Sequence, residues 1–142
     1  MQQVEVVRRL DAPPARVFSR YTDHRGWTDW AGLGRVTLDR VGTPTPDGVG
    51  CVRKITTAGF SVYEEVTHFE PDRRMVYRLV RGAVPIRNHE GEVLFEPDGD
   101  GTRVTWRCRF DSMIPGLGGL LRRGIARMFG DVLDRLARRG GL

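Results

Sequence analysis

The stretch TRVTWRCRF, residues 102–110, alternates without interruption between two kinds of side chain. In an extended strand, one face would carry Val104, Trp106, Cys108 and Phe110, and the other Arg103, Thr105, Arg107 and Arg109. This period-two pattern is typical of an antiparallel sheet with one buried face and one wet face. The turn sequence PDGDG, residues 97–101, comes directly before it, so we expect the second strand of a hairpin.

From residue 49 to residue 110 the chain has the pattern of successive hairpins, and a hairpin turn sets which residues face each other. A turn at 99–100 predicts the pairs Phe95–Val104, Val93–Trp106 and His89–Phe110. In VRKITTAGFSVYEEV, residues 52–66, a turn at 58–59 predicts Ile55–Val62, Arg53–Glu64 and Cys51–Val66. A turn at 71–72 then predicts His68–Met75, Val66–Tyr77 and Glu64–Leu79.

Joined through the irregular connection RGAVPIR, residues 81–87, these registers put Leu79 beside His89. One rung across the inner face then carries Arg53, Glu64, Leu79, His89 and Phe110. An unpaired buried charge is costly, so we expect Arg53 and Glu64 to pair. Three explanations stay open for this pair: the polar end of a ligand cavity, a structural clamp in a filled core, or a solvated pair produced by a one-residue slip.

We expect helices before and after the hairpins in the sequence. A strand over 3–10 precedes DAPPARVF, where Asp11 can cap a short helix that runs through Tyr21. A helical turn with Trp27 and Trp30 follows, and then a strand over 34–41. Residues 115–138 carry an apolar helical stripe made of Leu117, Leu121, Ile125, Met128, Phe129, Val132 and Leu136. Four glycines at its start predict loose first turns, either frayed or acting as a mobile gate.

Composition narrows the class of protein. A length of 142 residues predicts one domain over 1–142, and no apolar run approaches the ~20 residues of a spanning helix. The N-terminus lacks a signal core, so we expect a cytoplasmic protein without stable membrane insertion. Cys51 and Cys108 show no CxxC or Cys/His spacing, so we expect free thiols and no metal. The net charge of +5 comes from arginines scattered among acids, which argues against nucleic-acid binding.

Five segments in this order resemble the START-like (SRPBCC) superfamily, in its polyketide cyclase/dehydratase and lipid-transport branch. They are YTDHRGWTDWAGLGRV (21–36), GVGCVRKI (48–55), EEVTHFEPDRRMVYRL (64–79), GTRVTWRCRF (101–110) and IPGLGGLLRR (114–123). The resemblance implies an α+β helix-grip fold, in which a seven-stranded curved antiparallel sheet wraps round a long C-terminal helix, with two short helices after the first strand. It also implies a hydrophobic cavity between sheet and helix, and chemistry without metal or organic cofactor where members are enzymes.

On this basis we expect a protein that binds a small hydrophobic molecule such as a lipid, a polyketide or an aromatic compound. The expected ligand-binding residues are Arg53, Glu64, Tyr77, Leu79, His89, Trp106, Phe110, Trp30, Ile125 and Phe129. Arginine suits the polar end because its planar fork donates hydrogen bonds in fixed directions.

Two alternatives belong to other classes. A polyketide-type aromatase/cyclase or dehydratase would use His89 or Glu64 as base, and we favour His89 because Arg53 weakens Glu64 as a base. An interaction module would present the arginine-rich last helix to an acidic partner or membrane, although the sheet needs the apolar stripe of that helix. We expect a monomer or a homodimer.

Overall fold

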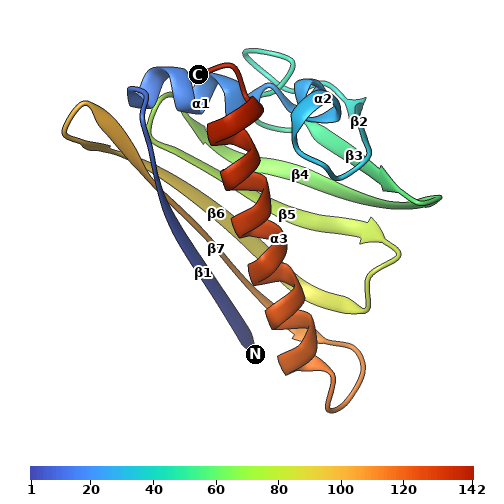
Figure 1. The fold of residues 1–142 in the computed structure, drawn as a ribbon. Coiled ribbons are helices and arrows are strands. Elements are labelled where there is room, and N and C mark those ends of the chain that lie inside the picture. Colours follow the sequence, from blue (N-terminus) through green and yellow to red (C-terminus); the bar gives the residue numbers. More distant parts are fainter.

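The computed structural model describes residues 1–142. Its elements follow in the order β1 (Gln2–Leu10), α1 (Pro14–Thr22), η1 (His24–Gly26), α2 (Trp27–Trp30), β2 (Arg35–Arg40), β3 (Val52–Thr57), β4 (Phe60–Glu70), β5 (Arg74–Gly82), β6 (Ile86–Asp98), β7 (Gly101–Ser112) and α3 (Gly118–Arg139). The strands form one antiparallel sheet in the order β1-β7-β6-β5-β4-β3-β2, and α3 crosses its concave face (Figure 1). These features confirm the predicted helix-grip fold.

Two of the predicted hairpin registers are confirmed where the strands pair. Between β3 and β4, Arg53 faces Glu64, and the turn residues Ala58 and Gly59 both have positive φ. A type I′ turn, one of the two common two-residue hairpin turns, requires positive φ at both central residues. Between β6 and β7, the predicted pairs Phe95–Val104 and Val93–Trp106 are present. The alternating pattern of 102–110 therefore points its apolar side chains inward.

The register between β4 and β5 follows the prediction in the middle of the sheet and departs from it near the turn. The predicted pairs Val66–Tyr77 and Glu64–Leu79 are present. However, His68 faces Val76 and not Met75, because the turn has three residues centred on Asp72 and the strand shifts after residue 66. As a result, His68 is exposed and Phe69 packs against the core.

A second irregularity breaks the predicted pair between His89 and Phe110. The register of β6 against β7 shifts between Arg87 and Glu90, and Asn88 has a positive φ of 53°. This bulge leaves His89 without a partner on β7, because the extra residue turns the strand locally. Phe110 instead pairs with Gln2 of β1 and is completely buried.

The helix α3 lies against β1 and β7 on the concave face of the sheet (Figure 1). Its apolar stripe contributes Phe129, Val132 and Leu136 to the core. It begins at Gly118, inside the glycine-rich stretch and three residues later than predicted. Phe129 stacks on Trp106 with the ring centroids 4.0 Å apart and the planes 8° from parallel. Val132 and Leu136 are fully buried one and two turns further along.

The short helix α1 closes the end of the core that lies near the C-terminal end of α3 (Figure 1). Phe18 and Tyr21 pack edge-on against Phe95, with ring centroids 5.1 and 5.6 Å apart. The predicted cap by Asp11 is wrong, because the N-cap position of α1 is Pro13, no side chain caps the helix, and Asp11 pairs with Arg9. None of the helices combines the length and the apolar character that crossing a membrane needs.

Candidate functional site

An apolar cavity of about 190 Å³ lies between the sheet and α3. Twelve of its sixteen lining residues are hydrophobic, and a mostly apolar lining with a few polar groups is typical of small-molecule sites. The lining comes from five strands, from α2 and α3, and from two loops: Trp27, Leu33, Arg53, Ile55, Thr57, Val62, Glu64, Tyr77, Leu79, Val84, Ile86, His89, Trp106, Ile125, Met128 and Phe129.

The polar end of the cavity is built on the ion pair between Arg53 and Glu64. Arg53 Nε lies 2.9 Å from Glu64 Oε1, and the arginine side chain is only 1% exposed. Its guanidinium lies between two aromatic rings, 4.7 Å from the centroid of Trp27 and 4.5 Å from that of Tyr77. Burial by itself would lower the pKa of Arg53. The negative charge of Glu64 acts in the opposite direction, and the pKa is raised above its usual value, so the guanidinium stays charged.

The arginine keeps unused donors beside the cavity. Only Nε donates to Glu64, and Nη1 is buried without any hydrogen-bond partner. Leaving a buried donor unpaired costs on the order of 1–3 kcal/mol. A ligand oxygen could reach Nη1 only if the side chains around it moved, because this atom is closed off from the cavity. Nη2 also makes no hydrogen bond and is not closed off in this way.

Tyr77 is held at the same end by contacts on both of its sides. Trp106 Nε1 donates to Tyr77 Oη at 2.8 Å, which leaves the tyrosine proton free to donate elsewhere. Burial raises the pKa of Tyr77 well above its usual range, so the phenol keeps this proton. The ring lies over Gly91, where an added Cβ would be 2.2 Å from Cζ, so only glycine fits under it.

His89 faces the cavity in one defined tautomer. The backbone N–H of Leu79 donates to His89 Nδ1 at 3.0 Å, so Nδ1 must carry the lone pair. Burial lowers the pKa of His89 below its usual value, which favours the neutral ring. A neutral ring with its lone pair on Nδ1 carries its proton on Nε2, so Nε2 is a hydrogen-bond donor.

The structure brings eight of the ten residues expected at the ligand site to this one cavity. They are Arg53, Glu64, Tyr77, Leu79, His89, Trp106, Ile125 and Phe129. Phe110 does not line it, because the bulge in β6 separates Phe110 from His89. Trp30 does not line it either, since Trp30 packs behind Trp27 with the ring centroids 5.6 Å apart.

Sequence reasoning left out half of the lining residues. They are Trp27, Leu33, Ile55, Thr57, Val62, Val84, Ile86 and Met128. The predicted inward face already contained Ile55 and Val62, so register could have found those two. The loop residues Leu33 and Val84 carry no periodic signal, and nothing in the pattern distinguishes Trp27 from Trp30.

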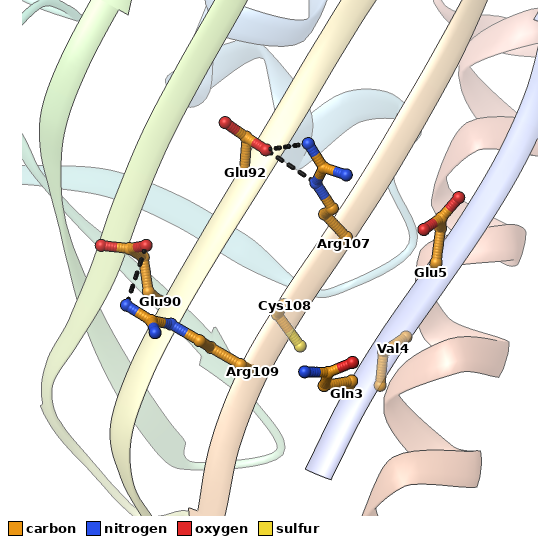
Figure 2. Close-up of a pocket in the computed structure, with 8 residues that line it drawn as sticks. All are labelled: Gln3, Val4, Glu5, Glu90, Glu92, Arg107, Cys108 and Arg109. Atoms are coloured by element: carbon orange, nitrogen blue, oxygen red, sulfur yellow. Dashed lines mark hydrogen bonds and ion pairs between the residues drawn. The ribbon is translucent and has the colours of Figure 1, made fainter. Parts of the chain in front are cut away.

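A larger hollow of about 510 Å³ lies on the outer face of β1, β7 and β6 (Figure 2). Six of its eight lining residues are polar or charged. Figure 2 shows both of its arginines joined to acids, Arg107 to Glu92 and Arg109 to Glu90, whereas Glu5 stands apart from them. Because water and these pairs satisfy the charges, the outer hollow is a weaker candidate than the cavity.

Comparison with known proteins agrees with the fold. The family model for polyketide cyclase/dehydrase and lipid transport matches residues 1–141. A sequence search among curated proteins finds no match.

Solved structures with the same fold include proteins of distant sequence. A protein from Thermobifida fusca is 24% identical with a TM-score of 0.82, and the match covers 99% of this chain and 94% of that one. Ara h 8.0201 is 13% identical with a TM-score of 0.78, with 98% and 97% covered. DynU16, described as a protein in the dynemicin biosynthetic locus, is 22% identical with a TM-score of 0.72, and the match covers 97% of this chain and 46% of DynU16. At these identities the likeness concerns the fold alone.

Proposed function

The chain belongs to the polyketide cyclase/dehydrase and lipid-transport family, and from this premise we propose that it binds one small, flat, apolar molecule in the inner cavity. The ligand carries a hydrogen-bond acceptor, such as a carbonyl, a carboxylate or a phenolate oxygen, at the end where Arg53 lies. The observation that carries the proposal is the buried guanidinium of Arg53, which lines an apolar cavity with unused N–H donors.

The donors at the polar end support an acceptor on the ligand. Arg53 offers Nη2, His89 offers Nε2–H, and the phenol of Tyr77 offers its proton. The one carboxylate among the lining residues, Glu64, already pairs with Arg53. The free acceptor at this end is Glu64 Oε2, so donors outnumber acceptors there.

The size of the cavity supports a small ligand. A cavity of about 150 Å³ in another protein is large enough for benzene, whereas drug-sized ligands use roughly 300–1,000 Å³. The 190 Å³ available here suit a substituted aromatic ring or a short chain. A long acyl chain or a polycyclic polyketide would require α3 or the β3–β4 hairpin to move outward.

The experiment is native mass spectrometry of the purified protein, followed by titration with aromatic acids and their neutral isosteres. Quenching of tryptophan fluorescence reports binding, because Trp27 and Trp106 line the cavity. We expect the acids to bind at least ~10-fold more tightly than isosteres without an acceptor, the discrimination that one good polar contact of about 1.4 kcal/mol provides. Stearate serves as the long-chain comparison.

The matched variants replace a whole pair on each face, so that neither leaves an isolated charge. R53M/E64L should abolish the preference for acids, whereas R107M/E92L on the outer face should keep it. Equal loss in both variants, or no bound mass and no titration with any ligand, contradicts the proposal. Tighter binding of stearate than of the aromatic acids contradicts the size argument.

A cyclase or dehydratase is the second candidate, because the family includes such enzymes and Glu64 Oε2 accepts no hydrogen bond in the cavity. The proton on His89 Nε2 makes His89 a donor to an enolate oxygen rather than the base. Glu64, which pairs with Arg53 through Oε1, is then the remaining candidate base. H89Q keeps a side-chain donor, so a demonstrated cyclisation that survives H89Q but not E64Q would support these roles.

A further inference from the structure

Three side chains able to bind a metal ion meet at the end of the sheet next to Arg53. They come from separate segments: His24 from η1, Asp47 from the loop before β3, and Cys51 from the residue that precedes β3. His24 Nδ1 lies 3.1 Å from Asp47 Oδ1 and 3.7 Å from Cys51 Sγ. All three atoms lie within 4.8 Å of one another.

The cluster is closed toward the core and reachable from solvent. His24 and Cys51 are completely buried, whereas the side chain of Asp47 is 21% exposed. An ion could therefore arrive past Asp47 and be held against the two buried donors.

The surrounding backbone holds the three donors in place. The N–H of His24 donates to Asp47 Oδ1 at 3.2 Å, and no hydrogen bond is made to Asp47 Oδ2. The loop is closed on itself by bonds from Thr43 N to Val49 O at 2.9 Å and from Cys51 N to Gly48 O at 3.0 Å. A carboxylate oxygen thus remains available on a side chain whose position is already fixed.

We propose that His24, Asp47 and Cys51 form a binding site for zinc or a similar divalent transition-metal ion. The ligand atoms are His24 Nδ1, a carboxylate oxygen of Asp47 and the thiolate of Cys51, whose proton leaves to solvent on binding. Imidazole, carboxylate and thiolate are the donors that zinc takes in proteins, at about 2.0–2.3 Å. Ligand atoms of a tetrahedral site are therefore about 3.3–3.7 Å apart, close to the 3.1 and 3.7 Å separations here.

A hydrogen-bonded latch explains this arrangement less completely. An N–H at Nδ1 can point at Asp47 Oδ1, but the thiol of Cys51 approaches the same nitrogen. A relay that activates a thiol places the thiol and the carboxylate on opposite ring nitrogens, so the cluster is not a nucleophilic triad either. A metal ion at Nδ1 uses all three groups together.

The site would reinforce the polar end of the cavity from behind. Cys51 lies two residues before Arg53 and therefore on the same inner face of the sheet. His24 comes three residues before Trp27, whose ring lies against the Arg53 guanidinium. A bound ion would tie η1 and the loop over 41–51 to the start of β3, with three protein ligands and one position left for water.

The test uses Co²⁺ as the spectroscopic probe for this site, in the full chain kept reduced without added thiols. We expect one Co²⁺ per chain, with a thiolate-to-cobalt charge-transfer band and the intense visible bands of a four-coordinate ion, both lost when Zn²⁺ is added. C51S should abolish the charge-transfer band. C108S is the matched control, because Cys108 is the other free buried cysteine and belongs to no such cluster, and it should keep the band.

A second variant separates metal binding from hydrogen bonding. D47N keeps an oxygen acceptor for His24 but removes the anionic ligand, so Zn²⁺ affinity should fall at least ~10-fold, while the unfolding midpoint without metal changes little. Zn²⁺ should raise the unfolding midpoint of the wild type and of C108S but not of C51S. Cobalt spectra without a charge-transfer band, or a band that survives C51S, would overturn the proposal and leave a hydrogen-bonded latch.

Discussion

Two arginine–glutamate pairs lie on opposite faces of the same sheet, each between residues that face each other on neighbouring strands. On the inner face, Arg53 Nε is 2.9 Å from Glu64 Oε1, and the residues face each other across β3 and β4. On the outer face, Arg107 Nε is 2.7 Å from Glu92 Oε1, and the residues face each other across β6 and β7 (Figure 2). The arginine side chain is 1% exposed in the inner pair and 47% exposed in the outer one.

The difference in burial changes what each pair does. Water can solvate the outer arginine, and Glu92 also pairs with Arg74, so losing one contact there leaves no isolated charge. The inner arginine has two aromatic rings and one carboxylate in place of water. The same kind of ion pair can thus be replaceable on one face and essential on the other, since desolvation makes a lost partner costly.

The largest effect is expected from breaking the inner pair. E64A should lower the free energy of unfolding by about 3–5 kcal/mol, because it leaves the Arg53 charge buried without a partner. E92A on the outer face should lower it by no more than about 1 kcal/mol, the usual value for exposed pairs. Urea denaturation of both variants measures the difference, and equal losses would mean that the sheet face does not decide the strength of the pair.

The next effect concerns the aromatic ring that covers Arg53. G91A should destabilise the fold by about 1–3 kcal/mol, because the new methyl group overlaps the ring of Tyr77 and pushes it off the guanidinium. The control is G124A in α3, where no atom lies within 4 Å of the added methyl group. That variant should stabilise the helix by about 1 kcal/mol, and a stabilising G91A would contradict the packing described for Tyr77.

Acidification should act on the inner face through His89. Burial lowers the pKa of His89 in the folded state, so the unfolded chain takes up the proton first and stability is lost as pH falls below about 6.5. One such proton contributes at most about 1.4 kcal/mol per pH unit. Denaturation curves from pH 7.5 to 5.5 should therefore fall less steeply for H89Q than for the wild type. Parallel pH profiles would mean that His89 is as easily protonated in the folded chain as in the unfolded one.

The smallest effect is expected when the inner pair is removed as a unit. R53M/E64L should stay within about 1 kcal/mol of the wild type, because apolar residues of similar volume can replace a buried ion pair without loss. Denaturation of this variant beside E64A separates the need for a partner from the value of the pair. A loss as large as that of E64A would mean that the charges themselves hold the sheet together.

Much of this arrangement could be predicted from short patterns. The alternation of 102–110 and the turn at Ala58–Gly59 identified the inward face and placed Arg53 opposite Glu64. These predictions held because two-residue turns leave one register, and because a slip would expose the whole apolar face. The role of Arg53 and Glu64 in ligand binding is a prediction that the experiments above test.

The departures occur where the backbone adds a residue to a strand pair. A three-residue turn at Asp72 moved His68 away from Met75, and the bulge at Asn88 moved His89 away from Phe110. Bulges depend on how a sheet bends to cover its core, which is a property of the whole fold. The bulge accompanies the rotation that lets His89 Nδ1 take the N–H of Leu79.

By itself, the sequence determined the succession of strands and helices, most of the inner face of the hairpins and the pairing of Arg53 with Glu64, because periodicity and turns are local properties. The family resemblance added the helix-grip fold. The tertiary structure decided that Trp27 and not Trp30 lines the cavity, that the cavity has room for about 190 Å³, and that His24, Asp47 and Cys51 meet. Those outcomes depend on how separate segments pack in three dimensions. Neither the spacing of residues along one segment nor their composition contains that information.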